Sequence, residues 1–586
     1  MVGTTSFTQG QRHDAGVARV VVTALAVAVS APAASQIVAD GERFHPVTAE
    51  RHMVVSQEAE ATRVGLDVLR RGGNAVDAAV ATAFALAVTL PRAGNIGGGG
   101  FMIVHLAGTS EAAAVDFREV APVAADRDMF LGPDGEADPE LSRRSGLAVG
   151  VPGTVAGLAL AHERYGSGTL DFAELVAPAV TLARDGFTVS EDTASALATP
   201  EVMERLTADP AASAYYPEGS APEGGRTLRL PALAGTLQAI ADGGPSAFYE
   251  GEVAQGLVDA VNARGGRMTV EDLAGYEAKV REPVRGTFGD TEVISMPPPS
   301  SGGVHLVQLL NTLADVPLAE YGLNSADAIH AMAEASKQAY ADRALYLGDP
   351  DFVEVPVAAL TSQDYADTIA TRIDMARATP STEIAADPGA LPAEGNETTH
   401  FSVVDAEGNA ASVTTTLNFS FGVGFAAPGG FLLNNELDDF SAKPGVPNAY
   451  GLIGGEANAV EPAKRPLSSM TPTILTRDGE VALVTGSPGG SRIITTVLQV
   501  ILNWTVHERN IAAATAAPRV HHQWLPDEIR VEEGISPDTV RLLEARGHTV
   551  VRRDAMGATQ SIAVAPDGTL TGASDPRRPG GLAAGD

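Results

Sequence analysis

The chain has 586 residues, of which 44% are hydrophobic and 19% are charged, and its formal net charge at pH 7 is −33. This length exceeds one ordinary domain, and the composition is that of a globular protein with a large core. A polyanionic surface repels nucleic-acid phosphates and anionic membranes, so we expect neither as a partner. The sequence contains no cysteine, which excludes disulfides, thiol nucleophiles and thiolate metal sites.

Residues 1–35 have the order of a secretory signal peptide. Basic residues (Arg12, Arg19) precede an apolar run over 20–29, and small residues follow at 30–35. The alternative is a retained anchor helix, but the run is far shorter than the ~20 residues that span a membrane. We therefore expect a periplasmic or secreted protein without a stable membrane span.

Helices and strands are then predicted in chain order. The patterns predict helices over 57–71, 74–90, 153–184, 248–265, 324–346 and 493–504, and strands over 101–106, 113–118, 399–404, 410–416 and 481–486. Residues 378–396 are rich in proline, alanine and acidic residues without any period. They are typical of an exposed linker, in which cleavage is tolerated.

A β-hairpin is predicted directly after this linker. Strands 399–404 and 410–416 flank the turn 405–409. If the hairpin is symmetric about Glu407, Thr416 lies opposite Thr398, within the ~4.5–5.5 Å of cross-strand neighbours. Thr416 would then be placed to hydrogen-bond Thr398.

Thr398 is the candidate nucleophile. A cut between Glu397 and Thr398 would expose an α-amine of pKa ~8, which can accept the proton of the threonine hydroxyl. The same hydroxyl can attack the preceding carbonyl, so the precursor could cut itself. Taken alone, a Thr-Thr pair at the start of a strand reflects β-propensity as readily as catalysis.

Acyl transfer also requires donors for an oxyanion. The loop 487–492 joins the strand 481–486 to the helix 493–504, and Gly489 and Gly490 lie within it. Backbone N–H groups at a helix N-terminus are suited to this task. A nucleotide-binding loop is the alternative, but neither of its glycine patterns is present.

Seven motifs occur together along the chain. They are Asp116-Phe117-Arg118-Glu119, Pro297-Pro298-Pro299-Ser300-Ser301-Gly302-Gly303, Asp342-Arg343, Thr398-Thr399-His400-Phe401-Ser402, Leu432-Leu433-Asn434-Asn435-Glu436-Leu437-Asp438-Asp439-Phe440, Arg465-Pro466-Leu467-Ser468-Ser469-Met470 and Thr485-Gly486-Ser487-Pro488-Gly489-Gly490-Ser491-Arg492. Together they resemble the γ-glutamyltransferase (γ-glutamyltranspeptidase, glutathione hydrolase) family of N-terminal-nucleophile hydrolases. The resemblance implies an α+β fold, a four-layer αββα sandwich, and two chains after self-cleavage: a heavy chain over 36–397 and a light chain over 398–586.

The resemblance also implies the substrate and its partners in the site. Arg118 would clamp the α-carboxylate of a γ-glutamyl group in its planar fork, and Ser468 and Ser469 would add hydroxyl donors. The ammonium would be bound by Asn418, Glu436 and Asp439, and Tyr450 would lie near the tip of a covering loop, 443–450. Glutathione and other γ-glutamyl compounds are the implied donors, water, amino acids or dipeptides are the acceptors, and no cofactor is required.

Four alternatives remain. His400 shares a strand face with Thr398 and could act as the base, although the amine already fills that role. His521 and His522 could suggest a metal, but packing near Trp524 fits better, and no metal is expected. A glutaryl or cephalosporin acylase of the same superfamily has no need for Glu436 and Asp439. A non-catalytic solute-binding protein has no need for Thr398.

Overall fold

The structure of the chain is a computed structural model. It describes residues 43–385, 398–446, 448 and 451–586. The predicted signal peptide, Glu397 and Tyr450 lie outside the described residues.

The first of two large sheets carries the predicted hairpin at its centre. Its seven strands run in the order β19 (Leu582–Gly585), β2 (Met53–Ser56), β10 (Thr399–Val404), β11 (Ala410–Thr416), β3 (Gly99–Leu106), β4 (Glu111–Phe117) and β7 (Lys279–Arg281). All neighbouring pairs are antiparallel. β10 and β11 pair from Thr399 with Thr415 to Val404 with Ala410. This register confirms the predicted symmetry about Glu407.

The second sheet also has seven antiparallel strands. Their order is β1 (Val47–Ala49), β18 (Leu570–Ser574), β17 (Gln560–Val564), β13 (Glu480–Thr485), β12 (Thr473–Arg477), β9 (Thr291–Ser295) and β8 (Val284–Phe288). β17 and β13 pack against β10 of the first sheet. The buried faces of the two sheets therefore form the interior of the molecule.

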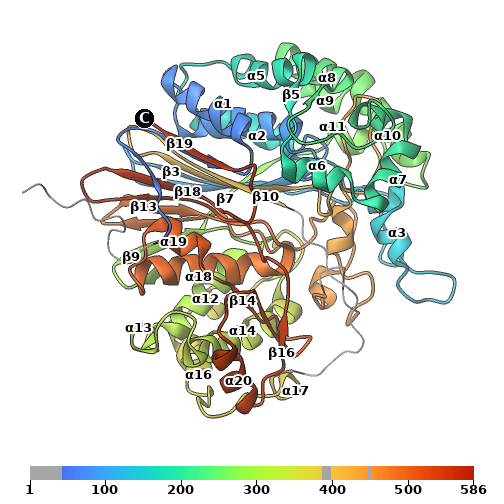
Figure 1. The fold of residues 1–586 in the computed structure, drawn as a ribbon. Coiled ribbons are helices and arrows are strands. Elements are labelled where there is room, and N and C mark those ends of the chain that lie inside the picture. The colour runs from blue at the N-terminus through green and yellow to red at the C-terminus, as the bar shows by residue number, and fades with distance from the viewer. Residues whose placement is uncertain (1–42, 386–397, 447, 449–450) are drawn as a thin grey trace, which may run out of the picture. The chain divides into compact units, whose positions relative to one another are not determined.

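Helices cover both outer faces of the paired sheets (Figure 1). Those on the side of the first sheet are α1 (Ala59–Arg70), α2 (Ala75–Thr89), α4 (Thr154–Tyr165), α5 (Phe172–Asp185) and α8 (Pro231–Gly243). Those on the side of the second are α12 (Gly302–Leu313), α14 (Ala326–Tyr346), α18 (Ile493–Thr505) and α19 (Ile511–Ala516). The predicted α+β, four-layer αββα sandwich is confirmed.

Further α-helices and strands occur in the described part of the chain. The helices are α3 (Pro139–Arg143), α6 (Glu191–Leu197), α7 (Pro200–Ala208), α9 (Ser246–Tyr249), α10 (Gly251–Asn262), α11 (Val270–Ala274), α13 (Leu318–Tyr321), α15 (Val357–Leu360), α16 (Gln363–Ala370), α17 (Ser381–Ile384) and α20 (Pro537–Ala545). The strands are β5 (Phe187–Thr188), β6 (Thr227–Leu228), β14 (Val520–His521), β15 (Ile529–Val531) and β16 (Val550–Arg552).

Three predicted segments differ in detail from the structure. The predicted helix 248–265 is divided between α9 and α10, with Glu250 extended between them. The helical stretch 153–184 divides into α4 and α5, because the backbone becomes extended at Gly166 and a capping box at Asp171 starts the second helix. The beginning of the predicted linker is ordered as α17. There the Ser381 hydroxyl donates to the Trp524 carbonyl at 2.6 Å, and the Ser381 amide donates to Asp527 at 2.8 Å.

Helix α2 is surrounded by protein on all sides. All fifteen of its residues are buried, as expected for the apolar stretch after residue 74, and Asn74 and Asp77 form a capping box at its start. None of the helices in the described part of the chain is both long and apolar enough to cross a membrane.

Candidate active site

Thr398 lies directly before β10 and is 5% exposed. Its Oγ1 is 3.5 Å from the Oγ1 of Thr416, which ends β11 on the neighbouring strand. Thr416 Oγ1 also accepts a hydrogen bond from the Asn418 amide at 2.8 Å. Asn418 turns the chain with a φ of +71°, and its side-chain amide donates to the Asn435 carbonyl at 2.9 Å. The hairpin register therefore fixes both hydroxyls at one point.

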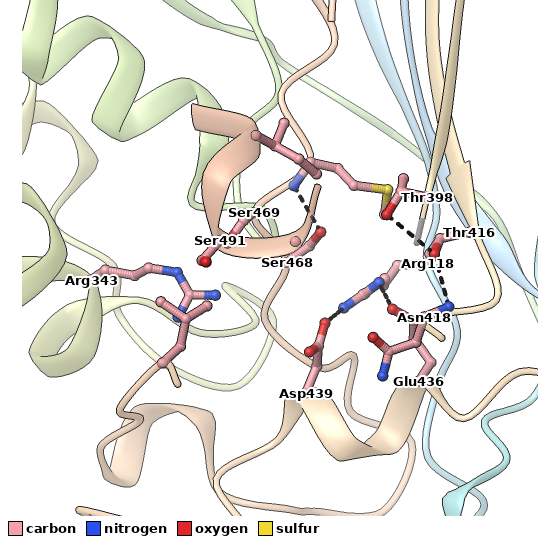
Figure 2. A pocket seen from close by; sticks show the side chains of 14 residues that line it. Arg118, Arg343, Thr398, Thr416, Asn418, Glu436, Asp439, Ser468, Ser469 and Ser491 are labelled. Atoms are coloured by element: carbon pink, nitrogen blue, oxygen red, sulfur yellow. Dashed lines mark hydrogen bonds and ion pairs between the residues drawn. The ribbon is translucent and has the colours of Figure 1, made fainter. Parts of the chain in front are cut away.

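Most of the predicted site residues surround one pocket (Figure 2). The predicted residues that line it are Arg118, Thr398, Thr416, Asn418, Glu436, Asp439, Ser468, Ser469 and Gly490. Gly489 precedes Gly490 in the same loop but is not part of the lining. Segments far apart in the sequence thus meet around the Thr398 hydroxyl.

Arg118 follows β4 and is almost completely buried, at 1% exposed. Its Nη1 bonds the Glu436 carboxylate, and its Nη2 lies 2.6 Å from Asp439 Oδ2. Nε and Nη2 also donate to the carbonyls of Pro466 and Leu467, at 3.1 and 3.2 Å. The guanidinium therefore orients both acidic residues, and a single N–H on Nη1 is left without a partner among the described residues.

Charge and burial oppose each other in this group. Burial alone would lower the pKa of Arg118, but Glu436 and Asp439 raise it above its ordinary value. Burial raises the pKa of Glu436 and of Asp439, and Arg118 opposes both shifts. Neighbouring Glu119 has its pKa raised to about 8, mainly by burial. A substrate ammonium would add a positive charge that keeps the Glu436 and Asp439 carboxylates ionised.

Ser468 and Ser469 lie on a loop that the start of α12 supports. The Ser301 amide and hydroxyl both donate to the Ser468 carbonyl, at 2.9 and 2.8 Å. Ser468 Oγ accepts from the Met470 amide at 3.1 Å. The Ser469 hydroxyl is buried and has no hydrogen-bond partner among the described residues. It is therefore available to a ligand.

The glycine loop lies between β13 and α18, as predicted. Gly489 and Gly490 have φ values of +133° and +56°, in the region that favours glycine. They lead directly into the N-terminus of α18, where backbone amides and the helix dipole favour negative charge. Gly490 thus lines the same pocket as Thr398.

His400 is buried away from the pocket. Its Nδ1 lies 2.9 Å from Thr414 Oγ1 and its Nε2 lies 3.2 Å from Ser402 Oγ. Burial lowers its pKa to about 3. With both nitrogens engaged elsewhere, His400 is positioned as a structural residue.

The histidines weighed as metal ligands also have protein partners. His521 bonds Thr495 at 2.7 Å and Gln523 at 2.8 Å, and His522 accepts from the Trp524 amide at 3.1 Å. These contacts are those of packed side chains.

A different group has suitable spacing for a metal among the described residues: His330, Glu334 and His548. His330 Nδ1 lies 2.7 Å from His548 Nε2. The Lys337 ammonium, however, lies 2.8 Å from Glu334 Oε1. The Lys337 ammonium neutralises the Glu334 carboxylate and would repel a metal cation. We therefore assign His330, Glu334 and His548 to a buried hydrogen-bonded network.

Some residues in and around the pocket were not predicted as site residues: the lining also includes Arg343, Leu452, Met470, Ser491 and Ile493, and Asn448 contacts Asp439. Arg343 lines the pocket from α14, and Asn448 donates to Asp439 Oδ1 at 3.2 Å. The sequence did point to Arg343, because it belongs to the family motif Asp342-Arg343 near the end of an alanine-rich helix. Nothing in the sequence pointed to Asn448.

Comparison with known proteins agrees with these observations. The family model described as Gamma-glutamyltranspeptidase matches residues 61–585. A glutathione hydrolase proenzyme of Escherichia coli (strain K12) is 55% identical, over 92% of this chain and 93% of that protein. An acylase, the ACY 1 proenzyme of Pseudomonas sp. (strain V22), is 38% identical, over 90% and 92%. The crystal structure of a cephalosporin acylase from Bacillus halodurans superposes with a TM-score of 0.78 at 27% identity, over 93% and 97%. The chain belongs to the γ-glutamyltranspeptidase family.

Proposed function

We propose that this chain is a self-cleaving γ-glutamyltransferase and glutathione hydrolase with Thr398 as its nucleophile. A single observation carries the proposal. One pocket unites the Thr398 hydroxyl with carboxylates for an ammonium, hydroxyl and guanidinium donors for a carboxylate, and a glycine loop for an oxyanion. These are the groups that a γ-glutamyl amide requires.

Maturation begins with the same hydroxyl. Thr398 Oγ1 attacks the Glu397 carbonyl carbon, the peptide C–N bond breaks, and an ester forms while the nitrogen gains a proton. Water then hydrolyses the ester. This releases the heavy chain, 36–397, with a new carboxylate, and the light chain, 398–586, with a free amine at Thr398.

Catalysis repeats this chemistry on the substrate. The amine of Thr398 accepts the hydroxyl proton while Oγ1 attacks the γ-carbonyl carbon, and the amides of Gly489 and Gly490 stabilise the oxyanion. The proton passes to the departing nitrogen as the amide bond breaks, leaving a γ-glutamyl ester. Water, or the amine of an amino acid or dipeptide, then attacks this ester. Thr416 orients the nucleophile throughout.

Binding both charged ends of the γ-glutamyl group fixes its γ-carbon beside Thr398. Glu436, Asp439 and the Asn418 side chain face the ammonium. The free N–H of Arg118, with Ser468 and Ser469, faces the carboxylate. Tyr450, in the predicted covering loop, would limit access of water and favour transfer over hydrolysis. With the signal peptide 1–35, the enzyme would act in the periplasm or outside the cell.

The test uses purified protein and a γ-glutamyl anilide, with and without glycylglycine. We expect anilide release that glycylglycine accelerates, and two bands on a denaturing gel. Thr398→Ala should stay as one band and release no anilide. Activity in this variant, or its separation into two chains, would contradict the proposal.

Acylase chemistry is the second candidate, since an acylase is among the relatives. A glutaryl donor lacks the α-ammonium, so two carboxylates, Glu436 and Asp439, would share the single positive charge of Arg118. We therefore expect the γ-glutamyl anilide to be preferred over the matching glutaryl anilide. A preference for the glutaryl compound would favour the acylase assignment.

A further inference from the structure

Ser491 connects the glycine loop to the body of the molecule. It directly follows Gly490 in the short 3₁₀ helix Gly490–Arg492, is 1% exposed, and lines the pocket (Figure 2). Its carbonyl accepts a hydrogen bond from the Tyr340 hydroxyl, and its own hydroxyl donates to Gln523 Oε1 at 2.7 Å. Ser491 is therefore held from two directions, by α14 on one side and by the segment after β14 on the other.

Gln523 is itself fixed by a chain of buried hydrogen bonds. Its Oε1 lies 2.8 Å from His521 Nε2, and His521 Nδ1 lies 2.7 Å from the Thr495 hydroxyl on α18. Burial lowers the pKa of His521 well below its ordinary value, so the ring is neutral and donates through one nitrogen only. An amide oxygen accepts and cannot donate, so Nε2 carries the proton and Nδ1 accepts from Thr495. Gln523 Oε1 thus receives two hydrogen bonds, one from Ser491 and one from His521.

The surrounding elements hold these side chains in place. The Gln499 side chain accepts from the Val520 amide at 2.9 Å and donates to the Val520 carbonyl at 2.8 Å, which binds β14 to α18. The Tyr340 ring packs edge-on against the His521 ring, with the centroids 5.7 Å apart. Tyr340, His521 and Gln523 are at most 3% exposed. Both hydrogen bonds to Ser491 therefore come from side chains that have little freedom to move.

The two glycines need such support. Gly489 and Gly490 have no Cβ, so their own conformational preferences do not fix the direction of their amides. An oxyanion donor is effective only when its N–H already points at the place where charge will develop. Because Ser491 is the residue directly after the glycines, its two hydrogen bonds restrict rotation of the Gly490–Ser491 peptide.

We propose that Tyr340 and Gln523 are positioning residues for the oxyanion donors. They hold Ser491 by its carbonyl and its hydroxyl, and so aim the Gly489 and Gly490 amides at the reacting carbonyl. This inference rests on the proposed function. Neither residue touches the substrate, and each acts through Ser491.

The experiment removes each contact without changing the loop itself. Tyr340→Phe deletes the hydroxyl that donates to the Ser491 carbonyl, and Gln523→Leu deletes the acceptor of the Ser491 hydroxyl. Each variant should lower kcat with the γ-glutamyl anilide by about tenfold, less than the roughly 10²- to 10³-fold loss on removing an oxyanion donor outright. KM should stay within about twofold of wild type, because the ground state makes little use of these amides.

Two inhibitors isolate the oxyanion contact. In a glutamate analogue with a boronic acid in place of the γ-carboxyl, the Thr398 oxygen adds to boron while its proton passes to the amine. The tetrahedral adduct places an oxygen where the oxyanion develops, whereas glutamate itself forms no such adduct. The Ki of the boronate should rise about tenfold, in step with the fall in kcat, and the Ki of glutamate should change by less than about twofold.

This split distinguishes positioning from a general structural role. A structural role would weaken both inhibitors together, or neither. The inference is wrong if both weaken equally, or if kcat and both Ki values match wild type.

Tyr216→Phe is the matched control for Tyr340→Phe. The Tyr216 hydroxyl is also buried and also donates to a backbone carbonyl, that of Leu197 at 2.8 Å, but Tyr216 does not line the pocket. This control should keep the wild-type kcat and both Ki values.

A milder variant carries the test if Tyr340→Phe or Gln523→Leu does not fold or stays uncut. Thr495→Val removes only the support of His521, and it should show the same split at about two- to fivefold. Thr505→Val is its control, because that hydroxyl bonds the Ile501 carbonyl within α18 at 2.8 Å.

Each variant is checked for separation into two chains and for thermal stability, and kcat is counted per cut chain. Inactive wild-type protein, or an active Thr398→Ala variant, would refute the proposed function. Active wild type whose variants show no split refutes only the assignment of Tyr340 and Gln523.

Discussion

The two threonines at the start of the hairpin have distinct tasks at the residue scale. In the proposed mechanism Thr398 supplies the attacking oxygen, whereas Thr416 is a positioning residue, because its hydroxyl accepts from the Asn418 amide and lies against Thr398. A wrong rotamer of the nucleophile would move its oxygen by more than an ångström, which is enough to lose much of the catalytic advantage.

Thr416→Val keeps the shape of the side chain and removes its hydroxyl. We expect kcat with the γ-glutamyl anilide to fall by about tenfold or more, as loss of one oriented hydrogen bond predicts, with slower self-cleavage. Thr414→Val is the matched control, because its hydroxyl lies on the same strand face but bonds His400. This control should lower stability and leave kcat within about twofold. Equal losses in the two variants would contradict the assignment.

Glu119 is a residue whose ionisation opposes folding. Both its carboxyl oxygens are buried without a partner in another described residue, and burial raises its pKa from 4.5 to about 8. The unfolded chain loses this proton at a lower pH than the folded protein. Native stability therefore declines as pH rises from about 4.5 through 8, since the folded state favours the protonated form.

Glu119→Gln removes this linkage. The variant and wild type should be equally stable near pH 4.5, and the variant should become more stable by a few kcal/mol above pH 8. Urea unfolding across pH 4.5–9 measures the difference, and exposed Glu252→Gln is the control. Parallel stability profiles for Glu119→Gln and wild type would show that Glu119 is ionised in the folded protein.

At the scale of elements, the glycine loop is tied to the hairpin by close packing. β13 ends at Thr485, and a Cβ on the next residue, Gly486, would come within 2.3 Å of the His400 ring on β10. Only a glycine lets the two sheets approach here. The contact sets the position of the Gly489–Gly490 amides relative to Thr398.

Gly486→Ala tests this contact. Overpacking predicts a loss of about 1–3 kcal/mol in the free energy of unfolding. It also predicts a lower kcat, because the loop is displaced from the nucleophile. Gly108→Ala is the control, since a Cβ there meets no atom within 4 Å. Denaturant unfolding and anilide turnover measure both effects, and an unaffected Gly486→Ala would mean that the sheets adjust without strain.

Helices and strands were easier to predict from the sequence than the long-range contacts between their side chains. The hairpin register followed from period-2 alternation and one turn, and α2 from an apolar run bounded by a cap and Pro91. The sequence could not show that Arg118 is held by Glu436 and Asp439, because these contacts span more than 300 residues. Nor could it place Arg343, since α14 is buried nearly all round and its pattern does not single out one face.

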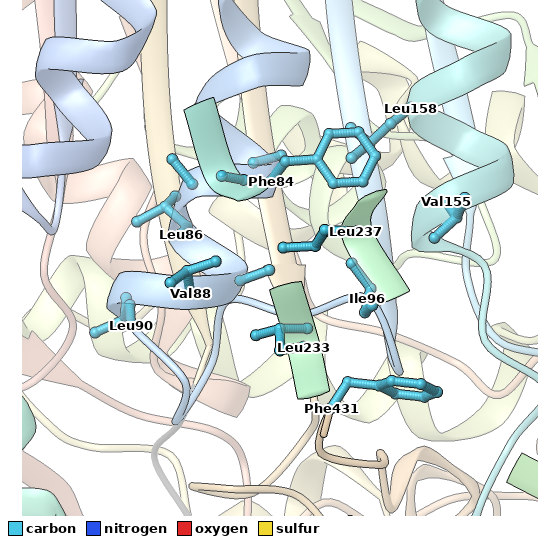
Figure 3. Packing of buried hydrophobic residues seen from close by; sticks show 14 of the residues in the cluster. Phe84, Leu86, Val88, Leu90, Ile96, Val155, Leu158, Leu233, Leu237 and Phe431 are labelled. Carbon is cyan, nitrogen blue, oxygen red and sulfur yellow. The ribbon is translucent and has the colours of Figure 1, made fainter. Parts of the chain in front are cut away.

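At the scale of the whole molecule, the segments on the two sides of Thr398 are interleaved. In the first sheet, β10 pairs with β2 and β11 pairs with β3. In the second, β12 pairs with β9 and β18 pairs with β1. The apolar core crosses the same boundary, because Phe431 packs in one cluster with Leu233 and Leu237 of α8 (Figure 3).

This interleaving predicts how the protein behaves after the proposed cut between Glu397 and Thr398. The heavy and light chains should migrate as one particle in native buffer, because separating them would break both sheets and expose the shared core. They should come apart only in denaturant, in one cooperative transition that both chains share. Size-exclusion chromatography with mass measurement gives the mass of the particle in native buffer and in urea. The uncut Thr398→Ala variant is the reference for a single chain. Two separate peaks in native buffer would mean that the sheets are not continuous across the boundary. A particle that stays whole places Thr398, from the light chain, permanently beside Arg118 and Arg343 of the heavy chain, as the pocket requires.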